Sequence, residues 1–196
     1  MKKLMILAVM ALAALTASAQ QEVGTWSVTP KVGLNLATIT DTDDANMKVG
    51  VVTGADLTYQ LAEKFAISAG AFYSMQGAKN KEGGVSYTMK LDYINVPILA
   101  NYYVIPGLAI KAGLQPGFNV GHKLKAEANG NSSEGDIPNF KSFDLAIPIG
   151  ASYEFNDFVI DARYNFGLTK LWDVSGSSSK NSVIQFTFGY KIPLAK

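Results

Sequence analysis

The feature that most constrains this chain is a two-residue alternation of apolar with polar or small side chains, repeated after residue 20. From Trp26 to Leu36 every second residue is apolar, and the residues between are polar or small. Successive side chains of a strand point to opposite faces, so this period predicts strands with one apolar face. Eight such segments follow one another, and no segment of comparable length has helical periodicity. They are residues 26–37, 49–61, 65–76, 89–102, 108–120, 143–155, 158–169 and 183–192.

The predicted strands are long. About 12 residues is above the usual strand length of about 5–6 and is enough for a tilted strand to cross a bilayer, which takes about 9–11. The segment 89–102 changes parity, because Met89, Leu91 and Tyr93 start on one face and the apolar set from Ile94 continues on the other. One extra residue near Tyr93 or Ile94 predicts a β-bulge there. Prolines inside a closed sheet are expected at bulges or strand ends, and four fall in these segments: Pro30, Pro97, Pro116 and Pro148.

The connections between the segments alternate between long and short. Residues 62–64, 105–107 and 156–157 are short links, whereas the others have nine residues or more. This alternation is typical of an antiparallel up-and-down barrel that has tight turns at one rim and loops at the other. The long connections are residues 38–48, 78–87, 122–142 and 173–181.

The two faces differ in a way that separates a membrane barrel from a soluble one. The apolar sets are nearly free of charge, as lipid-facing residues would be, and the other sets combine small and charged residues, as a narrow filled interior requires. Charges inside a closed lumen are expected to pair. The predicted lumen charge network has five bases and five acids, namely Lys31, Lys90, Lys111, Arg163 and Lys191 with Asp56, Asp92, Asp144, Glu154 and Asp161.

Aromatic residues gather toward both ends of the predicted strands, which is typical of the girdles at the two membrane interfaces. Those near the short turns are Trp26, Tyr59, Phe65, Tyr102, Phe155, Phe158 and Tyr190. Those near the loops are Tyr73, Phe118, Phe143, Phe166 and Trp172. A soluble eight-stranded ligand-binding barrel, with its apolar face inside, is the alternative.

The N-terminus has the layout of a cleaved export signal. Lys2 and Lys3 precede an apolar stretch at residues 4–15, and the small-x-small site ends at Ala19. We expect residues 1–19 to be the signal peptide and residues 20–196 to form one barrel domain. The mean hydropathy is +0.12, yet no apolar run reaches the length of a membrane helix. Net charge near zero argues against nucleic-acid binding, and the absence of cysteine excludes a disulfide scaffold and a thiol nucleophile.

The chain resembles the outer membrane β-barrel family of Bacteroidota that is called PorT-like. The resemblance spans residues 20–196 and rests on short motifs in order: KVGLN from Lys31, LDYINVPIL from Leu91, IPIGA from Ile147, RYNFGLT from Arg163 and FTFGY from Phe186. It implies a barrel in the outer membrane of a Gram-negative bacterium and contact with the outer-membrane assembly machinery. Such proteins end their last strand with an aromatic residue, whereas here six residues follow Tyr190.

Candidate catalytic and metal residues are few. His122 is the only histidine, and a triad would need it beside a serine and a carboxylate. Asp41, Asp43 and Asp44 could offer oxygens to calcium, but the loop lacks the spacing, glycine and final glutamate of a calcium hand. We therefore expect a non-enzyme without cofactor or metal.

These observations predict an eight-stranded transmembrane barrel with a side-chain-filled lumen and a structural or surface-interaction role. The loops 38–48 and 122–142 are the expected contact surfaces for an extracellular partner. Two other functions stay open, a narrow channel for small solutes or ions and a membrane-embedded hydrolase that uses His122.

Overall fold

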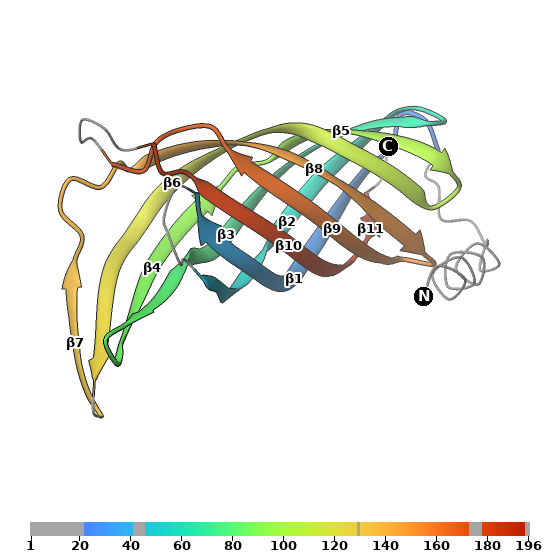
Figure 1. Ribbon diagram of the computed structural model, residues 1–196. Helices are drawn as coiled ribbons and strands as arrows, with labels where there is room; N and C mark the ends of the chain where they lie inside the picture. Colours follow the sequence, from blue (N-terminus) through green and yellow to red (C-terminus); the bar gives the residue numbers. More distant parts are fainter. Residues whose placement is uncertain (1–21, 41–45, 129, 173–177, 195–196) are drawn as a thin grey trace.

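The computed structural model describes residues 22–40, 46–128, 130–172 and 178–194, and these form one antiparallel sheet that closes on itself (Figure 1). The predicted signal peptide lies outside the described residues. Within them, no helix has both the length and the apolar character needed to cross a membrane.

Neighbouring strands pair in the order β10-β9-β8-β6-β4-β3-β2-β1, and β1 pairs with β10 to close the ring. β5 continues the line of β4 by pairing with β3 and β6, and the short β11 pairs with β1 after β10 ends. The strands are β1 (Trp26–Ile39), β2 (Asn46–Ala62), β3 (Phe65–Glu82), β4 (Val85–Asn95), β5 (Ile98–Ile105), β6 (Leu108–Ala128), β7 (Asn131–Asp136), β8 (Phe143–Phe155), β9 (Phe158–Gly167), β10 (Asn181–Tyr190) and β11 (Ile192–Pro193).

The predicted ring of eight antiparallel strands is confirmed. Its turn end holds the short links, where Gly107 and Asn156 take left-handed backbone conformations, with φ of 81° and 51°, that glycine and asparagine tolerate. At its loop end, two regions predicted as loops are strands instead. β3 and β4 pair across residues 79–88, and β6 runs on to Ala128 and pairs with β7 (Figure 1). Residues 79–82 and β7 carry no apolar side chain, so they lack the alternation that marks a strand in the sequence, whereas β6 does alternate there, with Leu124 and Ala126 between charged residues.

The predicted bulge in the fourth strand is wrong. Leu91, Tyr93 and Asn95 are all buried, so inward residues alternate through this part of β4 without a break. The register shift lies opposite, in β6, where Asp92 pairs with Gly121 and Tyr93 with Asn119. Leu91 and Tyr93 therefore point into the barrel, although their apolar character had placed them on the outer face.

All four prolines lie where strand pairing is interrupted on at least one side, as expected. Pro97 separates β4 from β5, and its carbonyl accepts a hydrogen bond from the Gly70 amide at 2.9 Å, which keeps the sheet continuous. The β6–β8 pairing has a gap opposite Pro148. Pro30 pairs with Ala55 of β2, but on its other side it lies where the partner of β1 changes from β11 to β10. Pro116 pairs with Leu145 of β8, but on its other side it lies where the partner of β6 changes from β5 to β4.

Candidate functional site

The middle of the lumen is crossed by five charged side chains, which we call the mid-lumen cluster: Lys31, Asp56, Lys111, Asp161 and Arg163. Lys31 Nζ lies 2.7 Å from Asp56 Oδ2 and 3.3 Å from Asp161 Oδ2. Asp161 also meets Lys111 Nζ at 2.7 Å and Arg163 Nε at 3.2 Å. One carboxylate thus contacts three cations, with its side chain 1% exposed. Charged hydrogen bonds of this kind tie four strands of the wall together.

Glycines in the wall make room for this cluster. A Cβ added at Gly70 would lie 2.3 Å from Asp56 Oδ1, and one added at Gly150 would lie 2.6 Å from the Cβ of Arg163. Both distances are shorter than real Cβ contacts. The lumen of an eight-stranded barrel is only wide enough for side chains to fill it, so small wall residues are needed beside long charged ones.

A second charged group closes the turn end of the lumen. Glu154 forms an ion pair with Lys191, and the Tyr103 hydroxyl donates to Glu154 Oε1 at 2.9 Å. The three residues come from β8, β5 and the link between β10 and β11, so the last part of the chain is held to the wall from inside.

Toward the loop end the lumen becomes first polar and then apolar. Asp144 accepts from Thr169 Oγ1 at 2.5 Å and from Asn181 Nδ2 at 2.9 Å, and Asn181 also donates to the Tyr93 hydroxyl at 3.1 Å. Above these lies an apolar group, which we call the loop-end cap. Its buried members are Ile39, Ala78, Leu91, Tyr93 and Leu171, with Met89, Ile137, Phe140 and Trp172 packed against them.

Eight of the ten charges predicted for the lumen point into it, and they comprise four acids and four bases: Lys31, Asp56, Lys111, Asp144, Glu154, Asp161, Arg163 and Lys191. The other two were placed wrongly because β4 has no bulge. Lys90 pairs with Glu134 at 2.5 Å outside the barrel, with its side chain 38% exposed. Asp92 contacts the hydroxyl of the outward-facing Tyr73. Since one base and one acid leave together, the eight remaining predicted charges balance.

Lys48 is a buried lysine that the sequence analysis missed, because residue 48 fell in a predicted loop. It lies near the start of β2, and its Nζ donates to the Gln76 carbonyl at 2.8 Å. Tyr103 and Lys191, which meet Glu154 at the turn end of the lumen, both occupy positions that alternation along the strand turns inward. For Tyr103 that parity was the only signal, because its aromatic ring favours an outward assignment.

Most of the predicted girdle residues lie on the outer wall. The Trp26 and Tyr59 rings pack at a tilt of 36° with centroids 4.6 Å apart at the turn end, and Phe118 and Phe143 pack edge to face at 5.8 Å near the loop end. The outward residues that are at least about one third exposed are Trp26, Tyr73, Tyr102, Phe118, Phe143, Phe158, Phe166 and Tyr190, while Tyr59, Phe65 and Phe155 are half-buried. Trp172 differs, because it packs against the loop-end cap and meets Phe140 edge to face at 6.0 Å.

His122 has no catalytic surroundings. Its Nδ1 lies 2.8 Å from Asn119 Oδ1, and its ring stacks on Phe140 at 5.3 Å. Neither neighbour can serve as a nucleophile or as an orienting carboxylate. Asp41, Asp43 and Asp44 lie outside the described residues. Among the residues that are described, no three histidine, aspartate or glutamate side chains gather as metal ligands would.

Beyond the loop end of the barrel, four strands project as a sheet, which we call the loop-end sheet. It consists of residues 79–82 of β3, 85–90 of β4, 121–128 of β6, and β7 (Figure 1). Glu134 on β7 meets Lys90 at 2.5 Å and Lys123 at 3.2 Å. Hydrogen bonds from these two lysines hold the pKa of the Glu134 carboxyl below its usual value. Every residue of β7 is exposed, and among the described strands β7 pairs with β6 alone.

Comparison with known proteins agrees with this architecture. Residues 18–173 match the family described as the outer membrane protein beta-barrel domain. The chain belongs to that family. No curated protein sequence matches the chain.

Solved structures show the same fold. Ail, the attachment invasion locus protein of Yersinia pestis, is 17% identical, with a TM-score of 0.54 over 87% of this chain and 100% of Ail. A second structure of Ail, in complex with the heparin analogue sucrose octasulfate, is 18% identical over 87% of this chain and 100% of that one, with a TM-score of 0.51. Neisserial surface protein A is 15% identical, with a TM-score of 0.52 over 85% of this chain and 97% of that one.

The chain is therefore an outer membrane β-barrel protein. Its outer wall carries exposed apolar residues on every strand of the ring, for example Leu34 on β1, Ile149 on β8 and Phe186 on β10. Its interior carries buried, ion-paired charges such as Lys31, Asp56 and Asp161. A soluble ligand-binding barrel would have the reverse arrangement.

Proposed function

We propose that this barrel anchors the loop-end sheet outside the cell, where the sheet contacts a partner, and that the lumen does not conduct. The observation that carries the proposal is the unpaired edge of β7, which stands in solvent above a barrel filled with side chains. A free strand edge offers a row of main-chain donors and acceptors to a partner strand. Ail, which has the same fold, was solved in complex with a heparin analogue, which supports a surface-contact role for this kind of barrel.

The contact surface that we propose is narrower than the loops predicted from sequence. Loop 122–142 contributes its paired part, β7 and the end of β6, while the central part of loop 38–48 lies outside the described residues. Ion pairs from Lys90 and Lys123 to Glu134 hold β7 in register across three strands. We expect this ordering to lower the entropy cost of binding.

The test is to shorten the β6–β7 hairpin and to measure binding of whole cells to immobilised extracellular proteins and glycans. Replacing residues 123–136 with a two-residue Asn-Gly turn removes the edge strand. A matched control replaces the exposed β7 residues Ser132 and Ser133 with other polar residues and keeps both the edge and the ion pairs of Glu134. We expect binding to be lost in the first variant only, with both variants still migrating faster unboiled than boiled in detergent gels. Binding that survives loss of the hairpin would refute the proposal.

The channel is the second candidate, and buried polar atoms of the lumen favour it. Asn35 Oδ1, Ser152 Oγ and Thr187 Oγ1 have no partner in the protein, so they can hold internal water. An ion path would have to cross both the mid-lumen cluster and the loop-end cap. Planar-bilayer recording separates the two functions, because stable single-channel steps from the purified barrel would refute the filled lumen.

Several finer features belong to the same proposal. We assign residues 1–19 to a cleaved signal peptide and residues 20–196 to the barrel domain of a Gram-negative, Bacteroidota-like, PorT-like protein. The assembly machinery would recognise the end of β10, near Tyr190. We assign no cofactor and no catalytic role, and among the described residues the His122 ring meets Asn119 and Phe140, which have no catalytic chemistry. N-terminal sequencing of the exported protein tests the cleavage site.

A further inference from the structure

A small apolar pocket lies between the loop-end cap and the loop-end sheet, and its volume is about 140 Å³. Four of its lining residues belong to the cap, and Leu124 adds an apolar side chain from β6. The apolar residues that line it are Ile39, Ala78, Met89, Leu124 and Trp172. A cavity of about 150 Å³ with such a lining stays free of water and binds benzene. The pocket therefore has the size and the lining for a single aromatic ring.

The pocket opens to solvent at the loop-end sheet. Asn80 pairs with Tyr87, and Met89 pairs with Leu124, so these four side chains share one face of β3, β4 and β6. Ala78 lies two residues before Asn80 and is buried in the cap, so the shared face is the one turned toward the barrel. Tyr87 and Leu124 are 37% and 40% exposed. A ligand that enters from the loop end therefore covers apolar surface that otherwise meets water.

The side chains at the rim of the pocket are polar but uncharged. Asn80 and Tyr87 line it, and neither the Asn80 amide nor the Tyr87 hydroxyl has a hydrogen-bond partner among the described residues. Lys79 lines the pocket too, but it alternates with Ala78 and Asn80, so its ammonium lies on the opposite face of the sheet. An amide and a phenol can each hydrogen-bond to a neutral polar group. A charged ligand would lose its hydration here without gaining a counter-ion.

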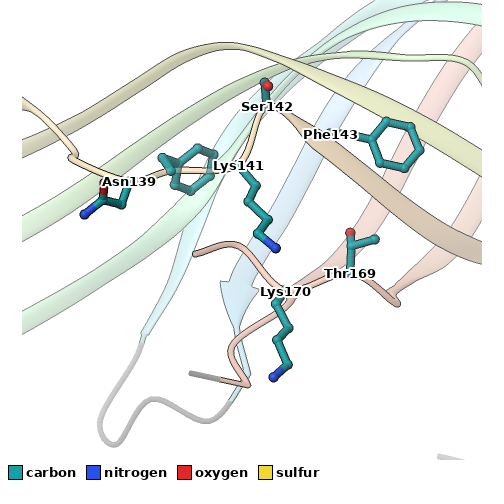
Figure 2. A pocket seen from close by; sticks show the side chains of 7 residues that line it. Asn139, Lys141, Ser142, Phe143, Thr169 and Lys170 are labelled. Atoms are coloured by element: carbon teal, nitrogen blue, oxygen red, sulfur yellow. The ribbon is translucent and has the colours of Figure 1, made fainter. Parts of the chain in front are cut away.

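A wider pocket lies beside the small one and differs from it in polarity. The wider pocket has a volume of about 650 Å³ and is lined by the segments 139–143 and 169–170 (Figure 2). Phe140 and Trp172, whose rings meet edge to face at 6.0 Å, line one pocket each, so the two pockets are neighbours. Lys141 and Lys170 line the wider one, which is therefore suited to water. The smaller pocket is the one that favours an aromatic ring over water.

We propose that the smaller pocket binds a neutral molecule with one aromatic ring and one hydrogen-bonding group, of which a phenol is the simplest example. The ring packs among Met89, Leu124 and Trp172, where a thioether sulfur and an indole make favourable contacts with an aromatic ring. The hydroxyl of the ligand hydrogen-bonds to Asn80 or Tyr87 at the rim. The site is separate from the partner surface, because none of the described lining residues belongs to β7.

The experiment adds p-cresol to the natural barrel in phosphatidylcholine nanodiscs and follows isotope-labelled methionine methyl groups by NMR. Beyond residue 19 the chain contains three methionines, Met47, Met75 and Met89. Met89 lines the pocket, whereas Met47 is 53% exposed and Met75 alternates with the buried Ser74 and Gln76, so it faces outward. We expect a saturable shift of the Met89 signal, while Met47 and Met75 report p-cresol that merely enters the lipid.

Two variants and a second ligand test the size of the pocket. Ala78→Leu fills it from the cap, and we expect the saturable Met89 shift to be lost. Ala126→Leu adds the same side chain to the same face of β6 but outside the pocket lining, so it is the matched control and should keep the shift. Naphthol, which has a second ring, should not bind the natural chain. Both variants are first shown to migrate as folded barrels in detergent gels.

A third variant tests the rim without changing the size of the pocket. Asn80→Leu/Tyr87→Phe removes both neutral polar groups from partly exposed positions. Since one neutral hydrogen bond is worth about a fivefold change in affinity, we expect the natural chain to prefer p-cresol over toluene by about that factor and this variant to bind both alike. The proposal is overturned if the Met89 shift never saturates, if it survives Ala78→Leu, or if naphthol binds as well as p-cresol.

Discussion

Asp161 is the residue on which the filled lumen most depends, and replacing it with asparagine tests that directly. The natural mid-lumen cluster has three cations and two carboxylates, and Asp161 contacts all three cations at 2.7 to 3.3 Å. Asp161→Asn leaves Lys31, Lys111 and Arg163 with Asp56 alone. Removing one partner from a buried ion pair costs about 3–5 kcal/mol, because the remaining charge stays buried without compensation. We expect a loss of that size in the free energy of unfolding.

The assay is urea unfolding of the barrel in lipid vesicles, followed by the fluorescence of its two tryptophans. Asp136→Asn on the exposed strand β7 is the control, and we expect it to change stability by less than about 0.5 kcal/mol. Adding Lys111→Met to Asp161→Asn restores the natural net charge of the cluster, so the double variant should recover part of the loss. Equal stability of Asp161→Asn and Asp136→Asn would refute the view that this network holds the lumen closed.

Three further outcomes follow from the structure. Leu91→Ala empties a fully buried position of the loop-end cap, and we expect it to cost about 2–5 kcal/mol in the same unfolding assay. Gly54→Val places a Cβ 2.1 Å from the Ala71 carbonyl, so refolding yield on heat-modifiability gels should collapse, whereas Gly135→Ala on the exposed strand β7, where a Cβ meets nothing within 4 Å, should refold. The lowered pKa of Glu134 stabilises β7 above the ordinary carboxyl pKa of about 4.3, and that stability is lost as pH falls through the lower, folded pKa. NMR of β7 amides should show the hairpin loosening there while barrel amides persist, and Glu134→Gln should remove this pH dependence.

The ring of eight strands could be predicted because the two faces of each membrane-crossing strand lie in different surroundings. Lipid on one side and a packed lumen on the other impose strict alternation, as in the segments around Leu34 and Ile149. The loop-end sheet could not be found in this way. Around Lys81 and Ser133 both faces of the sheet meet water, so strand pairing there depends on backbone hydrogen bonds and on a few ion pairs, which leave no periodic signal.

The same reasoning explains how far the candidate site could be predicted. The mid-lumen charges were found because Asp161 and Arg163 break an otherwise apolar strand at the inward parity. Their partners could not be assigned, since pairing depends on the stagger of strands that are far apart in sequence.

The error in β4 has a physical cause that is useful for reading other barrels. In that strand the apolar set changes from the inward residues Leu91 and Tyr93 to the outward residue Ile94 and its successors, yet the backbone alternation is unbroken. The same change occurs in β1, where Leu34 faces outward but Ile39 is buried in the loop-end cap. What changes along these strands is the medium around the outer wall, which is lipid inside the membrane and water above it. Inside the membrane apolar side chains turn toward lipid, and above it they turn away from water into a common core. A parity change with no insertion in the strand therefore marks the membrane boundary, and in this barrel it places Asp92 just outside the hydrocarbon.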